Sequence, residues 1–205
     1  MLPMLLSADR LAMRYGRRVL FRDLSFEVES GAPLAITGAN GAGKSTLLKI
    51  LAGVVEPAAG RVRLERDGRA VPDLDRPLAV GFVAPYLQLY DPFSAWENLA
   101  FLAKARRLPD GETRMKEVLD RVGLAARAHD PLATFSTGMR QRLRIAAALL
   151  HDPPVLLLDE PSATLDEAGR ALVDSVIATQ KIVVVATNEP EEAAKCARRL
   201  ALDAA

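Results

Sequence analysis

A glycine-rich segment at residues 38–46, GANGAGKST, carries the residue types that bind phosphate groups. It fits the pattern of a glycine, four residues, a second glycine, a lysine, and a serine or threonine. Gly38, Gly41 and Gly43 allow the backbone to turn its amide groups inward around an anion. A helix that starts at Lys44 would direct the positive end of its dipole at the same anion. The sequence therefore predicts a site for the phosphates of a nucleotide.

The chemistry expected of this segment is the binding of ATP with Mg²⁺. Lys44 is expected to reach the β- and γ-phosphates, the Ser45 hydroxyl to ligate Mg²⁺, and Thr46 to hold the α-phosphate. A glycine turn before a helix, without a ligand, is the alternative. The order of strand, glycine loop and helix over residues 34–51 favours the nucleotide site. The predicted ATP-binding residues of the segment are Gly38, Asn40, Gly41, Ala42, Gly43, Lys44, Ser45 and Thr46.

Two adjacent carboxylates, Asp159 and Glu160, directly follow the apolar residues 155–158. Such a run is typical of a central parallel strand, and ligands bind beyond the carboxyl ends of such strands. Asp159 is expected to hold Mg²⁺ through water, and Glu160 to accept a proton from the water that attacks the γ-phosphate. Adjacent carboxylates also occur at solvated strand ends. Their combination with Lys44 favours the catalytic interpretation.

The surrounding sequence predicts the strands that would position these groups. Short apolar runs at residues 34–37, 155–159 and 182–186 are each followed by turn residues and a helical pattern. This recurrence indicates a parallel sheet with helices on its faces. Residues 24–29 and 61–65 alternate between apolar and polar types, which indicates half-buried antiparallel strands.

Between residues 92 and 150 the strand signals disappear. Helical periodicity takes their place at residues 95–107, 113–122 and 139–150. This block is predicted to be an inserted helical subdomain.

The predicted fold class is α/β. It combines a P-loop NTPase core with a mostly parallel sheet, an antiparallel β subdomain and the inserted helical subdomain. We expect a single domain over residues 1–205. Within it, residues 1–84 and 151–205 would form the core with its β subdomain, and residues 85–150 the helical subdomain.

The composition argues against other kinds of site. The chain has 27 Lys and Arg against 26 Asp and Glu, a formal charge of +1, so no nucleic-acid partner is expected. Its single cysteine, Cys196, excludes an internal disulfide, and its two histidines do not favour a metal cage.

The N-terminal residues 1–10 do not resemble a signal peptide. Their apolar run has no basic lead-in, contains Pro3 and meets Asp9 early, so we interpret it as an edge strand. Nowhere does an apolar stretch approach the roughly 18 residues of a spanning helix. We therefore expect a cytoplasmic protein.

Three motifs now occur in one order along the chain. They are the loop at residues 38–46, the segment FSTGMRQRLRIAAALL at residues 135–150, and LLLDEP at residues 156–161. Together they resemble the ABC-type ATPases, and the resemblance covers nearly the whole chain. Alone, the middle segment would be an N-capped amphipathic helix. After a phosphate loop, it is similar to the signature motif of that family.

The resemblance implies roles for further residues. Ser136, Thr137 and Gly138, at the start of a helix, would bind the ATP of a partner subunit through hydroxyl, amide and helix dipole. Tyr15 stands where the family places an aromatic residue that stacks on adenine, and an ordinary surface or core aromatic is the alternative. Asp166, in a segment similar to the family's D-loop, would lie at the dimer interface.

Two positions depart from the family pattern. The family usually has a glutamine where this chain has Pro85, and Gln88 stands three residues later as a candidate Mg²⁺ ligand. The usual coupling route to a membrane partner is therefore in question. After Thr187, the family's γ-phosphate-sensing histidine is replaced by Asn188, whose amide can donate to phosphate but carries no charge. The predicted catalytic residues are thus Glu160, Lys44 and Asn188.

The resemblance implies the ATP-binding and hydrolysing subunit of an ABC transporter, similar to compact export subunits, at the inner face of the cell membrane. Two such subunits, copies or relatives, would enclose two ATP–Mg²⁺ and drive a separate transmembrane permease subunit. Two alternatives stay open. One is a soluble ABC-type ATPase in a task such as cluster assembly, and the other is a regulatory subunit that binds ATP but hydrolyses it weakly.

Overall fold

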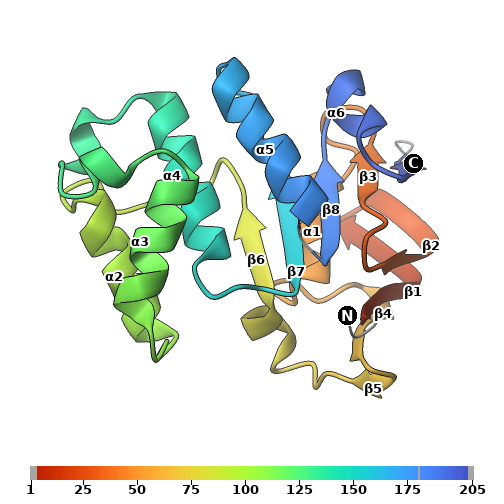
Figure 1. Cartoon of the computed structure of the whole chain (residues 1–205). Helices are drawn as coiled ribbons and strands as arrows, with labels where there is room; N and C mark the ends of the chain where they lie inside the picture. Colours follow the sequence, from red (N-terminus) through yellow and green to blue (C-terminus); the bar gives the residue numbers. More distant parts are fainter. Residues whose placement is uncertain (1–3, 180, 203–205) are drawn as a thin grey trace.

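The fold combines two sheets with a group of helices at one end (Figure 1). Within residues 4–179 and 181–202, which the structure describes, this computed structural model has a five-stranded parallel sheet and a four-stranded antiparallel sheet. The predicted α/β class is confirmed. Residues 1–3 of the predicted N-terminal strand, Pro3 among them, lie outside the described residues.

The parallel sheet sets the position of the candidate site. In sheet order its strands are β6 (Val80–Val83), β7 (Val155–Asp159), β8 (Ile182–Ala186), β3 (Leu34–Thr37) and β9 (Arg198–Ala201). Strand β8 lies between β7 and β3, so the segment that follows β8 lies between the segments that follow its two neighbours. Strand β9 was not predicted, because most of its residues are exposed at the sheet edge and give no apolar pattern.

Strand β7 is buried on both faces, which explains its continuous apolar sequence. Val155 and Leu157 belong to one hydrophobic cluster with helix α1 (Lys44–Leu51). Leu156 and Leu158 belong to a second cluster on the opposite face. The strand is therefore fixed from both sides up to Asp159.

The antiparallel sheet has the order β2 (Arg18–Glu29), β1 (Met4–Tyr15), β4 (Ala59–Arg66) and β5 (Arg69–Ala70). The predicted strands at residues 24–29 and 61–65 lie within β2 and β4. The interpretation of the N-terminal residues as an edge strand is wrong. Strand β1 pairs on both sides, Leu6 with Val28 and with Leu64. Its second partner lies far along the chain, so the N-terminal residues alone give no sign of it.

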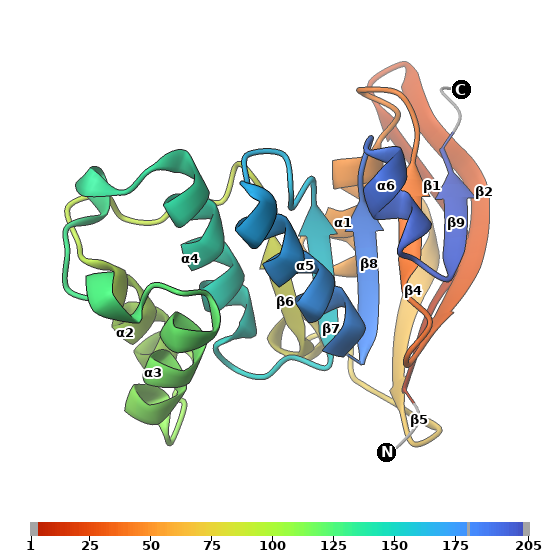
Figure 2. The same cartoon turned by 45° about the horizontal axis from the view of Figure 1, so that its top comes forward.

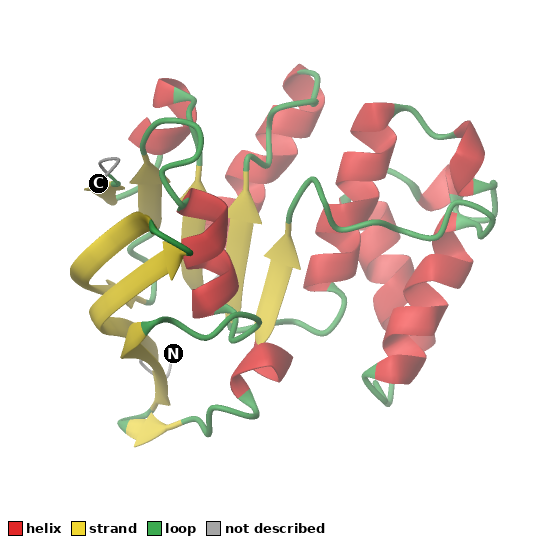
Figure 3. Cartoon of the chain, turned by 180° about the vertical axis from the view of Figure 1, so that it is seen from behind, coloured by secondary structure: helices red, strands yellow, loops and turns green. Residues whose placement is uncertain are grey.

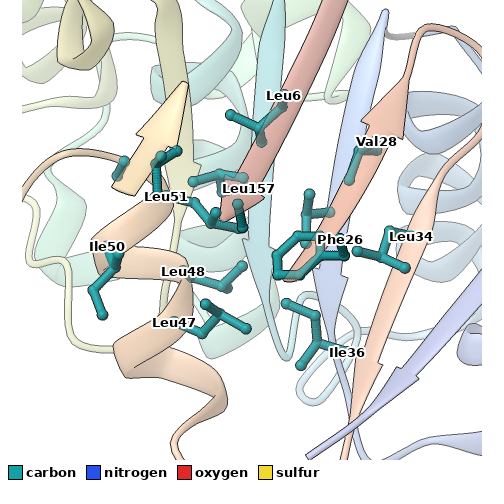
Figure 4. Packing of buried hydrophobic residues seen from close by; sticks show 14 of the residues in the cluster. Leu6, Phe26, Val28, Leu34, Ile36, Leu47, Leu48, Ile50, Leu51 and Leu157 are labelled. Atoms are coloured by element: carbon teal, nitrogen blue, oxygen red, sulfur yellow. The ribbon is translucent and has the colours of Figure 1, made fainter. Parts of the chain in front are cut away.

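Helix α1 packs between the two sheets, as the view from behind shows (Figure 3). Its apolar residues Leu47, Leu48, Ile50 and Leu51 are all fully buried. Figure 4 shows them in the same cluster as Phe26 of β2 and Leu157 of β7. This packing fixes the start of α1, and with it the position of Lys44.

The remaining helices lie at one end and along one face of the parallel sheet. Helix α4 (Thr137–Leu149) packs against β6, and α2 (Ala95–Ala105) and α3 (Gly111–Arg121) lie on the far side of α4 (Figure 2). Helices α5 (Glu167–Thr179) and α6 (Pro190–Ala194) follow β7 and β8 along the chain. Short 3₁₀ helices lie at η1 (Arg76–Ala79), η2 (Ala125–Arg127) and η3 (Leu132–Thr134). The three predicted helices of the insertion are confirmed, with ends shifted by one or two residues.

Helix α2 begins with a capping box. The Ser94 hydroxyl accepts from the Glu97 amide at 3.2 Å, and the Glu97 carboxylate accepts from the Ser94 amide at 2.7 Å. In the described part of the chain, we find no helix with the length and apolar character needed to cross a bilayer.

Candidate nucleotide site

A cavity of about 440 Å³ lies at the carboxyl ends of β3 and β7. It is lined by Tyr15, Arg18, Leu20, Asn40, Gly41, Gly43, Lys44, Ser45, Thr46, Asp159 and Glu160. The structure thus brings the glycine loop, both carboxylates and Tyr15 to one place. A cavity of this size with a few convergent polar groups is typical of a small-molecule site.

The glycine loop has a backbone that other residues would strain. Gly43, directly before α1, has a φ of 105°, and Gly38 has a φ of 146°. At Gly38 there is also no room for a side chain, because an added Cβ would lie 2.3 Å from the carbonyl oxygen of Leu202. Helix α1 begins at Lys44, as predicted. The loop and the helix start therefore form a cradle for an anion.

The Lys44 side chain is only 7% exposed and bends back over the loop. Its ammonium group donates to the Gly38 carbonyl oxygen at 2.8 Å and to the Asn188 amide oxygen at 2.8 Å. The Asn188 amide nitrogen in turn donates to the Asn40 side-chain oxygen at 2.8 Å. Asn188, from the segment after β8, is thus hydrogen-bonded to two residues of the loop.

Asp159 ends β7 and is 3% exposed. Burial raises the pKa of its carboxyl, and the Ser45 hydroxyl and the Lys44 and Lys49 charges oppose this rise only in part. Asp159 and Ser45 line the same cavity and both supply oxygen atoms. Oxygen ligands are what Mg²⁺ prefers, so these residues fit that ion.

Glu160 has a backbone φ of 47°, which is uncommon for a residue other than glycine. Two hydrogen bonds accompany this conformation. The Glu160 backbone amide donates to the Ala186 carbonyl oxygen at 2.9 Å, and the Asn188 backbone amide donates to the Glu160 carboxylate at 3.4 Å. Burial raises the pKa of the Glu160 carboxyl. Strained backbone of this kind is often found at functional sites.

The residues predicted to face a partner subunit lie together, away from this cavity. Ser136 caps α4, since its hydroxyl accepts from the Met139 amide at 3.2 Å. A Cβ added at Gly138 would lie 3.4 Å from the Thr164 carbonyl oxygen, so the start of α4 contacts the segment that carries Asp166. Thr137 is the first residue of α4.

The Asp166 carboxylate is held within the chain. It accepts from the Gly169 amide at 2.9 Å and from the Arg142 guanidinium at 2.7 Å. The Gly169 amide, followed by Arg142, lowers the pKa of this carboxyl. Asp166 thus joins α4 to the start of α5.

Gln88 does not lie with the other predicted Mg²⁺ ligands. Among the described residues, it lines two other cavities, each of which also includes Arg144. It is not one of the residues that line the cavity around Lys44. The Arg144 guanidinium donates to the Leu87 carbonyl oxygen at 2.9 Å and so holds this segment against α4. A role for Gln88 in binding Mg²⁺ stays a prediction.

Two residues that line the cavity were missed in the sequence. Arg18 and Leu20 lie on β2, directly after the turn that follows Tyr15. They are two positions apart, so they point to the same face of the strand. Their spacing of two positions, directly after Tyr15, the candidate residue for stacking on adenine, is a signal that could have identified them.

The family model described as "ABC transporter" matches residues 21–163 of this chain. The matched range contains the glycine loop, the start of α4 and both carboxylates. It covers more than half of the 205 residues.

Individual proteins agree with this match. The linearmycin resistance ATP-binding protein LnrL of Bacillus subtilis (strain 168) is 34% identical over 168 residues, which cover 81% of this chain and 54% of that protein. The chain therefore spans about half of LnrL. The cytochrome c biogenesis ATP-binding export protein CcmA of Rhizobium meliloti (strain 1021) is 37% identical over 193 residues, 91% of this chain and 92% of that protein.

A solved structure shows the same fold. It is a dimer of the ATP-binding cassette MJ0796 in a post-hydrolysis state, bound to ADP and Pi. The TM-score is 0.80 at 25% identity, over 96% of this chain and 94% of that one. The chain therefore belongs to the ABC transporter family, as one of its ATP-binding proteins.

Proposed function

We propose that the chain binds and hydrolyses ATP as the motor subunit of an ABC transporter. The observation that carries this proposal is the meeting of Lys44, Asp159 and Glu160 around one cavity beside the glycine loop. Names of relatives support it, because CcmA is called an export protein and the MJ0796 dimer holds the products of hydrolysis. Because CcmA is called an export protein, we also propose that this chain is an exporter-type subunit.

Lys44 supplies positive charge for the β- and γ-phosphates. Its ammonium group already makes two hydrogen bonds at 2.8 Å, one of them to the Asn188 amide oxygen. A γ-phosphate oxygen would compete with Asn188 for this donor. Once displaced from Lys44, the Asn188 amide can rotate and donate to the phosphate.

Glu160 is the proposed general base. Burial raises its pKa, which increases the affinity of the carboxylate for the proton that the attacking water gives up. The backbone amide of Asn188, 3.4 Å from this carboxylate, holds it close to the Asn188 side chain, the proposed γ-phosphate sensor. Base and sensor are therefore positioned by the same turn after β8.

Mg²⁺ would be held by the Asp159 carboxylate and the Ser45 hydroxyl, with Gln88 as a further candidate ligand. When bound, this ion would neutralise negative charge on the β- and γ-phosphates. Tyr15, which lines the same cavity, is the proposed platform for adenine.

A second ATPase subunit would complete the site. Ser136, Thr137 and Gly138 present the start of α4, where free backbone amides and the helix dipole attract an anion. Asp166 lies beside them at the proposed interface. We propose that two subunits, copies or paired relatives, enclose two ATP head to tail, so that ATP favours the dimer and hydrolysis releases it.

The proposed partner of this pair is a transmembrane permease subunit, and the proposed location is the cytoplasmic face of the cell membrane. A tagged Glu160→Gln chain, purified with Mg²⁺ and ATP from detergent-solubilised membranes, tests this. A protein with several spanning helices should co-purify in stoichiometric amount. The matched control is the Lys44→Ala chain, which should lose the ATP-bound dimer.

If only soluble proteins co-purify, the proposed transporter function is wrong, and a non-transport ATPase such as one for cluster assembly takes its place. A second candidate is a regulatory subunit that binds ATP and hydrolyses it weakly. The presence of Asn188, which carries no charge, favours this second candidate. The rate of ATP hydrolysis by the purified complex distinguishes the motor subunit, which hydrolyses ATP rapidly, from the regulatory subunit, which hydrolyses it weakly.

A further inference from the structure

Arg18 lines the cavity and contacts the glycine loop. Its guanidinium Nη2 donates to the Gly41 carbonyl oxygen at 2.9 Å. A Cβ added at Gly41 would lie 3.1 Å from the same nitrogen, so the guanidinium covers this part of the loop closely. Arg18 is the first residue of β2 and is exposed.

The guanidinium has more donors than this contact uses. Arginine carries five N–H groups in a planar fork that matches the geometry of phosphate oxygens. The hydrogen bond to Gly41 occupies one nitrogen of Arg18. Among residues 4–179 and 181–202, the other donors of Arg18 have no hydrogen-bond partner, so they can contact a ligand in the cavity.

The distribution of charge around the cavity supports such a contact. Among its described lining residues, the cations are Lys44 and Arg18, and the anions are Asp159 and Glu160. Lys44 is buried on the inner side of the loop, where it contacts Asn188, the proposed γ-phosphate sensor. Arg18 is exposed and lies at Gly41, within three residues of Tyr15, the proposed adenine platform.

We infer that Arg18 is a second cationic ligand for the nucleotide, which contacts its phosphates on the side nearer the adenine. This inference rests on the proposed ATP-binding function and adds a residue to that site. Because the α- and β-phosphates are common to ATP and ADP, Arg18 stabilises both nucleotides equally. The contact does not depend on the γ-phosphate, so it lowers KM and leaves kcat unchanged.

The test uses the full chain with four substitutions and measures the Kd of ADP with Mg²⁺ and of ATP without Mg²⁺. Arg18→Ala should weaken both nucleotides by about tenfold, the size of one charge-assisted hydrogen bond. Arg18→Lys keeps the charge and should recover part of this loss. Arg18→Gln keeps a neutral donor for Gly41 and should recover none. The matched control is Arg17→Ala, an exposed arginine in the turn directly before Arg18.

Four outcomes would each contradict a different part of the proposal. If the wild type binds neither nucleotide, the proposed function fails. If the wild type binds and Arg18→Ala binds equally well, only the role of Arg18 is wrong. If Arg18→Gln recovers as much affinity as Arg18→Lys, Arg18 merely fixes the Gly41 carbonyl, and the inference is also overturned. An unequal effect on ATP and ADP would move the contact to the γ-phosphate and contradict the stated position.

Discussion

The ammonium nitrogen of Lys44 lies 2.8 Å from the amide oxygen of Asn188, a residue 144 positions away in the sequence. The pairing of β3 with β8 brings the two residues together, since Leu34 and Val184 are register partners and the chain continues from both strands toward the same edge. The position that replaces the family's histidine is therefore in direct contact with the phosphate-binding lysine. Its chemistry should affect hydrolysis.

Histidine at this position should accelerate hydrolysis. An imidazolium can place positive charge on the transition state, which the Asn188 amide cannot. We expect Asn188→His to raise the turnover rate at saturating ATP about tenfold, which corresponds to about 1.4 kcal/mol of transition-state stabilisation. Asn188→Ala is the control for loss of the Lys44 contact and should lower the rate. A rate that histidine leaves unchanged or lowers would refute this role.

Aspartate at position 136 should separate the two roles of Ser136. Aspartate can also cap α4, so Ser136→Asp should leave the free energy of unfolding nearly unchanged. Ser136→Ala removes the cap and should lower the free energy of unfolding by about 1 kcal/mol. The added negative charge would repel the partner's γ-phosphate. In a Glu160→Gln background, the ATP-dependent dimer should disappear by size-exclusion chromatography. Persistence of this dimer would show that the start of α4 does not face a partner's ATP.

Two glycines allow the cost of backbone strain to be distinguished from the cost of a steric clash between an added side chain and a neighbouring atom. Gly16 and Gly38 both have positive φ, 58° and 146°, but an added Cβ meets nothing within 4 Å at Gly16 and the Leu202 carbonyl oxygen at 2.3 Å at Gly38. Gly16→Ala should cost about 1 kcal/mol of unfolding free energy in urea. Gly38→Ala should cost clearly more and abolish nucleotide binding. Equal costs would mean that the loop tolerates a side chain.

The buried carboxylate of Asp159 should reduce stability at neutral pH. Burial raises its pKa, so the folded protein binds the proton more tightly than the unfolded chain does. The free energy of unfolding should therefore rise as the pH falls through the raised pKa toward the ordinary one. Asp159→Asn should accordingly be more stable than the wild type at pH 7, and this difference should shrink at lower pH.

Asp166 provides the control of opposite sign. The Gly169 amide and Arg142 lower its pKa, so its contribution to stability is present at neutral pH and is lost as the pH falls. Asp166→Asn should be less stable than the wild type at pH 7. Urea unfolding of both variants from pH 8 down to about pH 3, which is below the ordinary pKa of an aspartate, measures the two effects. If Asp159→Asn is less stable than the wild type at pH 7, burial of the charged Asp159 carboxylate does not reduce stability, and this prediction is wrong.

Local sequence was sufficient where a motif and its supporting elements are contiguous. The glycine loop lies between β3 and α1 in one unbroken segment, so its position could be predicted from the sequence. Asp159 was equally predictable, because burial of β7 on both faces produces a continuous apolar run that ends at the carboxylate.

Pairings between distant segments could not be predicted. The central position of β1 depends on its contact with β4, and the meeting of Lys44 with Asn188 depends on the order of the parallel strands. Arg18 was missed for a similar reason. Its target, the Gly41 carbonyl, is 23 residues away and comes within reach only when β2 folds over the loop.

In the proposed mechanism, Glu160 activates water for ATP hydrolysis in a site shared by two subunits. The most direct test compares wild type and Glu160→Gln for ATP binding, ATP-dependent dimerisation and release of phosphate with Mg²⁺. We predict that Glu160→Gln binds ATP as the wild type does, accumulates as a dimer and hydrolyses ATP at least about 100-fold more slowly. Hydrolysis at the wild-type rate would exclude Glu160 as the general base and require another residue in this role.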